Sequence, residues 1–504
     1  MANIKRIAIV GSGIAGLASA KTFSEQGLDC VVYERSDRLG GVWADGYSNF
    51  GVQVPKELYE FPDWPMPGDA PHFTPGPVFQ QYLEDYVDHF KFRSCIRFNA
   101  SVTKLESQAN TSDAWTVTVE IDGKTQREDF DFVVIATGLY SNVPKAPSYP
   151  GESEFRGAIL HNSEVKTRTP LTGRNVVVVG YGKSAADIAL EASEVGKDVH
   201  LVFRDTHWPV PRLVAGVLPF KWGALNRLAS ACMPLYQRPS PIERGLHRFG
   251  QPLVWTFWRI FEIVIRVQYR LGAEIANGKN LLPSAPIETD ACGEGSMVVH
   301  PDFFPRIHEG RISAHRTEID RYTSDGVVLK DGIEISTDCV VLATGWKSEF
   351  GYLSDDARTA LGSDDDGFYL YRHMLHPDLP NLAFVGRATA VCNILTDSLQ
   401  ARWLAELIAG RIVLPDPADM RREIEGIKTW KRSWMHYSPA RATRLFLHAQ
   451  HYHDELMTDI GVDPLRKRGL FAPLKELFAP YEPRDYRAIV AGEWKRPDKP
   501  SMLR

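Results

Sequence analysis

Two short apolar stretches, one at the N-terminus and one near residue 175, are each followed by a glycine-rich turn and a run of small residues. The first reads KRIAIVGSGIAGLASAKTF and the second reads NVVVVGYGKSAADIALEA. Uninterrupted apolar runs of this length predict strands of a parallel sheet that is buried on both faces. The small residues that follow predict a helix packed closely on that sheet. The pattern therefore predicts an α/β fold with two Rossmann-like units.

A second repeated pattern indicates where each unit ends. IDGKTQREDFDFVVIATG, which ends at Gly138, and LKDGIEISTDCVVLATGW, which passes Gly345, both lead from polar turn residues into an apolar strand that closes in Ala-Thr-Gly. Small residues there, Thr137 among them, leave room for backbone beside a cofactor at the carboxyl edge of the sheet. One copy precedes the second glycine turn and the other follows it. We therefore predict that the second unit is inserted into the first, with crossings near Pro150 and Arg321.

These crossings divide the chain into a predicted order of domains. Residues 1–150 and 322–414 are expected to form the first dinucleotide-binding domain, and residues 151–321 the second, which carries a helical insertion at about 205–297. Residues 415–504 are expected to form a helical C-terminal extension with an irregular tail, to which the sequence assigns no chemistry.

Within the insertion, LVWTFWRIFEIVIRVQYRLG predicts an amphipathic helix from Leu253 with a broad apolar face. Its charged residues, Arg259, Glu262, Arg266 and Arg270, disfavour a membrane span. Packing on the nucleotide domain is the favoured interpretation. A surface that touches a membrane, or a tunnel for an apolar substrate, is the alternative.

Each glycine turn has the spacing that brings backbone close to a pyrophosphate at a helix N-terminus. The first turn contributes Gly11, Gly13 and Gly16, and the second contributes Gly180, Gly182 and the permissive Ala185. Two such turns in one chain point to two bound dinucleotides and to electron transfer between them.

The residues that end the next strand distinguish the two cofactors. DCVVYERS ends at Glu34, whose carboxylate can accept hydrogen bonds from a ribose 2′-OH, which suits FAD or NAD. DVHLVFR ends at Arg204, which suits the 2′-phosphate of NADPH. In the sequence HWPVPR that follows, Arg212 is a candidate second phosphate contact.

Composition excludes several other classes of protein. The 504 residues carry a net charge of −5 with acids and bases interspersed, which argues against a nucleic-acid partner. The six cysteines form no Cys-x-x-Cys pair and no metal-ligand spacing, so we expect a reducing compartment, no dithiol chemistry and no metal site. No charged-then-apolar leader precedes Ile7, and a cytoplasmic location is the default expectation.

Further motifs, in order along the chain, resemble those of the flavin-containing monooxygenases with two dinucleotide-binding domains. They are GGVW at 40–43, the linker FRGAILHNSEVK with Phe155, Gly157 and His161, GYGKSAAD, ATGW at 343–346, and HPDLPNLAFVG leading to LQARW at 399–403. The match runs from Ile7 to about Gly410.

The resemblance implies where the cofactors bind. FAD would lie on the first domain, and NADPH would lie across Ser184 to Asp187 of the second. His161 would sit near the cofactor junction as a linker and positioning residue rather than a base. The cofactor-binding positions that the family motifs add are Gly41, Val42, Trp43, Ser184, Asp187, Gly386 and Gln400. Trp43 would cover the flavin.

The resemblance also implies an activity. NADPH would reduce FAD, the reduced flavin would react with O2, and the resulting C4a-hydroperoxyflavin would pass one oxygen atom to a nitrogen or sulfur atom of a small organic substrate. The protein would hold the nicotinamide against the isoalloxazine, exclude water and place hydrogen-bond donors where charge develops. The oligomeric state is left open by the sequence.

One departure from the family bears on the choice of reaction. In FGVQVPKELYEFPDWP, Gln53 stands where relatives carry asparagine, and where Baeyer–Villiger relatives carry aspartate. A neutral amide can hydrogen-bond flavin or nicotinamide without adding negative charge, which favours oxygenation of a heteroatom. After His161 the chain has Val165-Lys166 in place of the tryptophan typical of Baeyer–Villiger enzymes.

Two alternatives remain open. One is a Baeyer–Villiger monooxygenase that converts a ketone to an ester. The other is a flavoprotein that binds NADPH as a redox sensor and has slow oxidase activity. Gln53 and the inserted segment keep the second alternative open, because both lie where a productive site could be altered.

Overall fold

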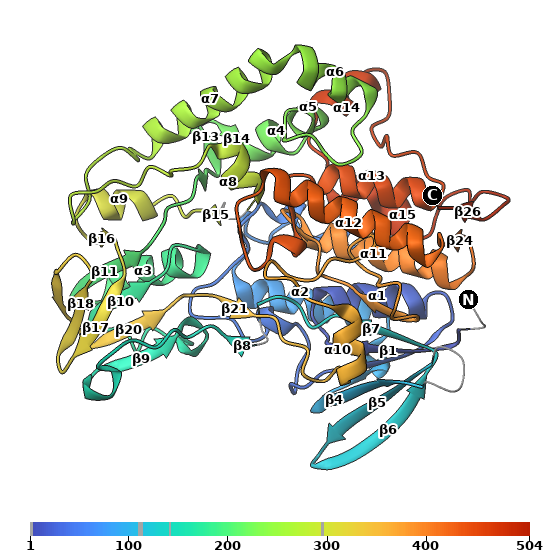
Figure 1. The fold of residues 1–504 in the computed structure, drawn as a ribbon, viewed down its shortest axis with the longest axis horizontal. Helices are drawn as coiled ribbons and strands as arrows, with labels where there is room; N and C mark the ends of the chain where they lie inside the picture. The colour runs from blue at the N-terminus through green and yellow to red at the C-terminus, as the bar shows by residue number, and fades with distance from the viewer. Residues whose placement is uncertain (1–3, 109–113, 141–142, 294–296, 504) are drawn as a thin grey trace.

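Two parallel sheets lie side by side beneath a layer of helices in the computed structural model, which describes residues 4–108, 114–140, 143–293 and 297–503 (Figure 1). Helices of the insertion run along the top of the view, and most helices of the C-terminal extension lie over the first sheet. The expected α/β fold with two Rossmann-like units is confirmed.

The first sheet is entirely parallel and has the strand order β22-β7-β1-β2-β3. Its strands are β1 (Arg6–Val10), β2 (Asp29–Tyr33), β3 (Ile96–Arg97), β7 (Phe132–Ile135) and β22 (Leu382–Phe384). Alternate residues of β1 serve the two faces: Ile7 and Ile9 pack in the cluster with the helices, whereas Ala8 and Val10 pack on the opposite side. A strand buried on both faces needs apolar residues at every position, which is the pattern the sequence shows.

Helices cover one face of this sheet and a β-meander covers the other. The covering helices are α1 (Ile14–Ser24), α2 (Gly76–His89) and α11 (Asn393–Ile408). The meander consists of β4 (Ala100–Ser107), β5 (Trp115–Ile121) and β6 (Lys124–Phe130). Only α1 of these helices directly follows β1, so the sheet is completed by segments from distant parts of the chain.

The second sheet is also parallel and has the order β16-β11-β10-β20-β9. Its strands are β9 (Ala158–His161), β10 (Asn175–Val179), β11 (Asp198–Phe203), β16 (Ser313–Arg316) and β20 (Cys339–Leu342). Helix α3 (Lys183–Val195) follows β10 after the second glycine turn, and its alanines are buried against the sheet.

The return to the first sheet lies later than the sequence suggested. β20 pairs with β10 and β9, so the second sheet extends to Leu342 and the crossing follows it rather than lying near Arg321. The segment around Arg321 instead forms an antiparallel unit of β17 (Ile319–Thr323), β18 (Gly326–Leu329) and β19 (Glu334–Ser336). Its apolar residues pack on the second sheet, whereas Asp320, Arg321 and Glu334 on its strands are exposed.

The two crossings between the sheets are hydrogen-bonded to each other. β8 (Val143–Pro144) on the outward crossing pairs antiparallel with β21 (Trp346–Lys347) on the return. The Lys145 N–H also donates to the Gly345 carbonyl at 2.9 Å. Figure 1 shows β8 and β21 between the two sheets.

The insertion forms a cap of short elements around one long helix. They are β12 (Pro209–Val210), β13 (Leu213–Val214), β14 (Leu218–Pro219), α4 (Phe220–Ala224), α5 (Arg227–Ala231), α6 (Pro241–Phe249), α7 (Gln251–Gln268), α8 (Ile287–Gly293) and β15 (Met297–Val298). Helix α7 is the amphipathic helix expected from Leu253, and it begins at Gln251, just before that residue.

Helix α7 packs on the protein partly through its charged residues. Val254, Trp258 and Ile265 are buried in the core of the second domain. Arg259 pairs with Glu288, and Glu262 accepts a hydrogen bond from the Ile287 N–H at 2.9 Å. These contacts give the first N–H of α8 an acceptor and turn Arg259 and Glu262 inward, whereas Arg266 is exposed. As a result apolar side chains face outward, with Leu253 70% and Val267 71% exposed.

Helices of the C-terminal extension pack on the first domain and on α5 of the cap. They are α12 (Pro417–Trp434), α13 (Ala449–Asp459), α14 (Ala472–Phe478) and α15 (Arg487–Val490). A two-stranded parallel sheet joins β23 (Thr389–Ala390) of the first domain to β25 (Arg444–Phe446) of the extension. Throughout the described ranges, no helix combines the length and the apolar character that crossing a membrane requires.

Candidate functional site

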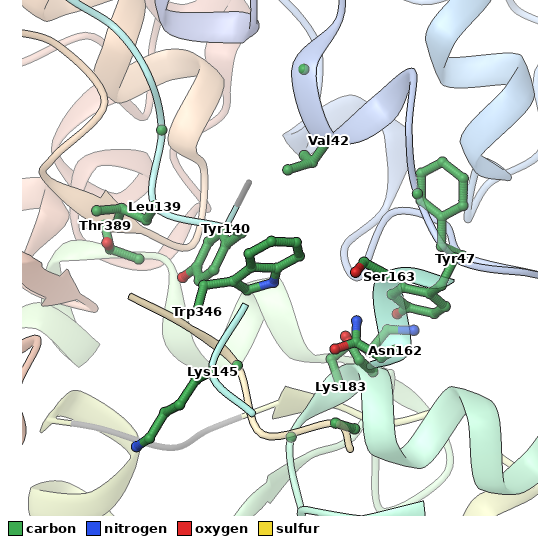
Figure 2. Close-up of a pocket in the computed structure, with 18 of the residues that line it drawn as sticks. Val42, Tyr47, Leu139, Tyr140, Lys145, Asn162, Ser163, Lys183, Trp346 and Thr389 are labelled. Atoms are coloured by element: carbon green, nitrogen blue, oxygen red, sulfur yellow. The ribbon is translucent and has the colours of Figure 1, made fainter. Parts of the chain in front are cut away.

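A cavity of about 1770 Å³ is lined by residues from the carboxyl ends of both parallel sheets. Figure 2 shows Tyr140, Trp346 and Thr389 in one part of it and Tyr47, Asn162, Ser163 and Lys183 in another. Many sequence-predicted positions line this cavity: Gly11, Gly13, Glu34, Gly41, Val42, Trp43, Gln53, Thr137, Gly138, Gly180, Gly182, Ser184, Arg204, Gly345 and Gly386. The other predicted positions lie behind the lining: Gly16, His161, Ala185, Asp187, Arg212 and Gln400.

The three glycines of the first turn meet different physical demands. Gly11 has φ +101°, and a Cβ there would lie 2.8 Å from the Ala136 carbonyl oxygen. A Cβ on Gly16 would lie 1.9 Å from the Gly11 carbonyl oxygen, so α1 can approach the turn only without a side chain. Gly13 is different, because a Cβ there would meet only the Gly41 Cα at 4.0 Å and would otherwise point into the cavity. The space over Gly13 fits a pyrophosphate.

The second turn repeats this arrangement with one change. Gly180 has φ +132°, and a Cβ there would lie 2.4 Å from the Ala343 carbonyl oxygen. A Cβ on Gly182 would meet nothing within 4 Å, so this position also leaves open space at a helix N-terminus. Ala185 replaces the third glycine, and its Cβ lies 3.5 Å from the position of a Cβ on Gly180. Both turns therefore fit a dinucleotide.

Glu34 is held in place at the end of β2. Its carboxylate accepts hydrogen bonds from the Ser12 N–H at 2.9 Å and the Ser12 hydroxyl at 2.8 Å. The Ser36 N–H donates to its other oxygen at 2.9 Å. Three donors fix the carboxylate at the cavity wall, and its remaining lone pairs can accept from a ribose.

The two arginines expected near a phosphate occupy different environments. Arg204 is exposed at the end of β11 and lines the cavity. Arg212 is away from the lining, with its guanidinium over the Phe73 ring at 3.7 Å, and burial lowers its pKa. Arg204 is therefore the one of the two that is free to meet a ligand in the cavity.

Aromatic side chains form a wall around Trp43. Its ring lies 4.3 Å from Phe79 and 5.4 Å from Tyr59, measured between centroids. Trp43 and Tyr59 both line the cavity. Nearby, Gln53 lies between the buried residues Val52 and Val54, and its side chain is exposed at the cavity wall. An amide donor thus stands at the edge of an aromatic surface.

His161 joins the linker to the return crossing. Its Nε2 donates to the Gly345 carbonyl at 3.1 Å, so its Nδ1 is the acceptor facing the Ser163 hydroxyl at 2.8 Å. The ring meets Trp346 edge-on at 4.9 Å. Burial lowers the pKa of His161, which favours the neutral ring in this arrangement. The geometry is that of a brace, in keeping with the positioning role expected for this residue.

Asp187 connects the two domains. Its carboxylate accepts a hydrogen bond from the Tyr47 hydroxyl at 2.7 Å and pairs with Lys183 on the same helix. One residue further on, the Ser48 hydroxyl donates to Glu191 at 2.9 Å. Tyr47 and Ser48 follow the GGVW motif of the first domain, whereas Asp187 and Glu191 lie on α3 of the second. The segment over the first cofactor site is therefore tied to the helix of the second.

Gln400 supports the last turn of the first domain from behind. Its carbonyl oxygen accepts from the Gly386 N–H at 3.2 Å, and its amide donates to the Tyr452 hydroxyl at 2.8 Å. Close to Gly386, the Asp397 carboxyl lines the cavity, is only 5% exposed and has no hydrogen-bond or ion-pair partner within the described ranges. Burial raises the pKa of Asp397 well above its ordinary value.

Sequence reasoning missed several residues of the cavity wall. They are Tyr47, Tyr59, Asn162, Ser163, Lys183, Thr389, Asp397 and Arg444. Lys183 could have been found, because it stands inside the second glycine motif. Arg444 carried no signal, since it is brought to the cavity by the pairing of β25 with β23.

Comparison with known proteins places this geometry in a family. A family model described as flavin-binding monooxygenase-like matches residues 4–234 and 288–502. A probable flavin-containing monooxygenase 1 of Arabidopsis thaliana is 29% identical, with 96% of each chain covered.

Two solved structures share the fold. The S-allyl-L-cysteine S-oxygenase of Allium sativum has a TM-score of 0.62 at 20% identity, with 98% of this chain and 94% of that one covered. The cyclohexanone monooxygenase of Rhodococcus sp. Phi1 bound to NADP+ has a TM-score of 0.67 at 19% identity, with 91% and 97% covered.

Proposed function

Because the chain belongs to the flavin-binding monooxygenase-like family, and is an NADPH-dependent flavin monooxygenase with FAD and NADPH as cofactors, we propose that it oxygenates a nitrogen or sulfur atom of a small organic substrate. The observation that carries the choice of reaction is Gln53. It supplies a neutral amide at the cavity wall. The resemblance to the family implies an aspartate at this position in Baeyer–Villiger enzymes.

The residues of the chain divide the work of holding two cofactors. FAD, when bound, accepts a hydride from NADPH and activates O2. Gly13 and Gly182 leave the space for the two pyrophosphates, Glu34 accepts from a ribose, and Arg204 meets the 2′-phosphate. These roles follow from the open space and the charges that the cavity presents.

Other residues keep the two sites aligned and dry. Trp43 and its aromatic neighbours exclude water from the flavin end of the cavity. Tyr47 and Asp187 fix the first cofactor segment against α3, and His161 holds the Gly345 carbonyl at the crossing. Gln53 donates a hydrogen bond without bringing negative charge to the reacting region.

The neighbouring segment supports the same choice. Val165 is fully buried, and the Lys166 ammonium donates to the Asp45 carboxylate at 2.7 Å. Baeyer–Villiger enzymes typically have tryptophan at this distance after the linker histidine. In this chain Lys166 instead connects the linker to the segment that follows GGVW.

The packing of α7 and the state of the cysteines both support expectations about membrane contact and cellular location. Val254, Trp258 and Ile265 anchor α7 in the core, which supports packing rather than membrane contact as the main role of the helix. Five cysteines are free thiols: Cys30, Cys95, Cys232, Cys339 and Cys392. They support a reducing compartment such as the cytoplasm.

The test supplies the holoenzyme with three probes in parallel: methyl phenyl sulfide, N,N-dimethylaniline and cyclohexanone. We expect sulfoxide and N-oxide in near-equal amount to the NADPH consumed, with little hydrogen peroxide released. Lactone from cyclohexanone, with neither sulfoxide nor N-oxide, would show the Baeyer–Villiger alternative. Quantitative release of peroxide with every probe would favour the redox-sensor alternative.

A further inference from the structure

The short sheet between the first domain and the C-terminal extension carries polar groups on the cavity wall. β23 and β25 run parallel, with Thr389 opposite Arg444 in the register. Both residues line the cavity, and Figure 2 shows Thr389 among its side chains. Two polar side chains, one from each strand, are therefore presented to the cavity at the same step of the ladder.

Arg444 has no counter-charge. Within the described ranges its guanidinium forms no ion pair and no hydrogen bond, and its Nε is buried. Its nearest aromatic contact is the Phe446 ring at 5.1 Å. Neighbouring arginines are paired: Arg441 and Arg432 both bind Asp366. A partly buried guanidinium costs free energy unless an anion pairs with it, so this one is set up for a ligand.

The Thr389 hydroxyl also lacks a hydrogen-bond partner among the described residues. The Thr389 side chain is 5% exposed. A buried hydroxyl without a partner costs about 1–3 kcal/mol, so such groups are rare unless something else fills the site. A carboxylate has two oxygens, one for a guanidinium and one for a hydroxyl.

The surroundings of Arg444 and Thr389 are mostly apolar. Phe220, Phe446 and Leu447 also line the cavity. Behind the strand, the Lys431 ammonium is buried and donates to the Ala442 carbonyl at 2.8 Å. Burial, followed by the charge of Arg444, lowers the pKa of Lys431. An anion here would be attracted, and an apolar body attached to it would find matching walls.

We propose that Arg444 and Thr389 bind an anionic group of carboxylate type on the substrate, with the apolar part of the substrate against Phe446, Leu447 and Phe220. The proposal rests on the proposed oxygenation of a heteroatom and names the substrate class: amphiphilic acids that carry an oxidisable nitrogen or sulfur. β25 belongs to the C-terminal extension, outside both dinucleotide-binding sheets, so the pair is not needed for the cofactor phosphates, which the glycine turns accommodate.

The test compares two sulfides with the same chain length and different end groups: 3-(methylsulfanyl)propanoate ends in an anionic carboxylate and 3-(methylsulfanyl)propan-1-ol in a neutral hydroxyl. A charge-assisted contact favours the acid over the alcohol by about 10- to 100-fold in kcat/KM. Arg444→Met is expected to bring that ratio close to one, Arg444→Lys to keep part of it, and Thr389→Val to lower it about fivefold. Arg422→Met, on the exposed side of α12, is the matched control and is expected to keep the full ratio.

A second readout does not depend on turnover. Propanoate, which cannot be oxygenated at sulfur, is titrated into the holoenzyme while the flavin absorbance is followed. We expect its dissociation constant to rise about 10-fold or more in Arg444→Met, with the FAD content of the purified variant unchanged. Thr389→Val provides the same comparison should Arg444→Met fail to fold.

The outcomes separate this proposal from the proposed function. If neither of these sulfides is oxygenated, and the three-probe test yields neither sulfoxide nor N-oxide, the proposed function fails, while propanoate binding still decides the role of Arg444. The proposal would be overturned if the acid-to-alcohol ratio of kcat/KM were unchanged in Arg444→Met. An unchanged dissociation constant for propanoate in that variant would also overturn it. A shifted flavin midpoint potential with an unchanged ratio would assign the pair to the cofactor instead.

Discussion

At the scale of single residues, the glycines of the two turns have separate tasks. Gly11 and Gly16 are required by the protein itself, since a Cβ on either would collide with backbone. Gly13 and Gly182 leave space that only a ligand can use. Glycines within one motif are therefore required for different reasons, some for folding and others for ligand binding.

This difference predicts opposite effects of two substitutions. Gly13→Val should leave the thermal unfolding of the FAD-free protein nearly unchanged, and should weaken FAD binding about 10-fold or more because the side chain enters the space of the pyrophosphate. Gly16→Ala should destabilise the fold by about 1–3 kcal/mol or more, because its Cβ would meet the Gly11 carbonyl. Unfolding curves and a flavin titration measure both.

Gly426→Ala is the matched control, because a Cβ there meets nothing within 4 Å. If Gly13→Val retained FAD with native affinity, the assignment of the first turn to a pyrophosphate would be wrong.

Arg204 gives a second prediction at this scale. Its exposed guanidinium at the end of β11 is assigned to the 2′-phosphate, and a charge-assisted contact of that kind is worth about 1.5–3 kcal/mol. Arg204→Ala should raise KM for NADPH about 10- to 100-fold and leave KM for NADH nearly unchanged. Steady-state kinetics with both nucleotides measure this.

Arg156→Ala, at an exposed ion pair with Asp325 in the same domain, should change neither value. Preserved NADPH preference in Arg204→Ala would move the phosphate site elsewhere.

At the scale of residues, the sequence is most informative where a motif fixes the local backbone. The glycine turns and Glu34 lie at the cavity because the strand-turn-helix unit places them there. Asp397 and Arg444 escaped notice, because their approach to the cavity depends on pairing between segments far apart in the chain. Arg212 reads as a phosphate ligand in the sequence, but its guanidinium stacks on Phe73 outside the cavity wall.

At the scale of secondary-structure elements, contacts override local pattern in two places. The crossing predicted near Arg321 falls inside the β17–β19 unit, whose apolar residues pack on the second sheet. Helix α7 was expected from its periodicity and is present. Its orientation could not be read from the periodicity, because Arg259 and Glu262 find partners on α8.

The tie between the GGVW segment and α3 predicts an effect on coupling. Tyr47→Phe removes the hydrogen bond to Asp187, and we expect a several-fold higher KM for NADPH and a larger share of NADPH oxidised with release of hydrogen peroxide. The physical reason is that the first cofactor segment loses its anchor on the second domain. Product and peroxide are measured in the same reaction.

Tyr369→Phe is the matched control, because its hydroxyl donates to Asp366 at 2.9 Å within the C-terminal part of the molecule. It should lower stability without changing the peroxide share. If Tyr47→Phe and Tyr369→Phe released the same share of hydrogen peroxide per NADPH oxidised, Tyr47 would not be an anchor between the domains.

At the scale of the whole molecule, buried histidines make the fold sensitive to acid. Burial lowers the pKa of His448 and of His453 from 6.5 to about 3. The unfolded chain therefore binds protons that the folded chain does not, and this contribution to stability is complete above pH 6.5 and declines as the pH falls below it. Each histidine should cost about 2 kcal/mol of stability at pH 5.

A single variant isolates this contribution. His453→Asn should reduce the loss of unfolding free energy between pH 7 and pH 5 by about 2 kcal/mol relative to the unmodified protein. Comparing the two proteins cancels opposing groups such as Glu60, whose pKa burial raises to about 7. Urea unfolding at both pH values measures the difference, and an unchanged loss would contradict the buried neutral state of His453.

The ribbon of β8 and β21 has a consequence for how such a molecule can be taken apart. The chain leaves the first sheet and returns to it through two strands that pair with each other, so the second domain is attached by ends that already touch. A domain attached in this way can be removed or replaced as a unit without separating the ends of the remaining chain. Removing 145–345 would leave two neighbouring chain ends that a short turn can join. Another nucleotide-binding domain whose own termini are adjacent could be inserted at the same place.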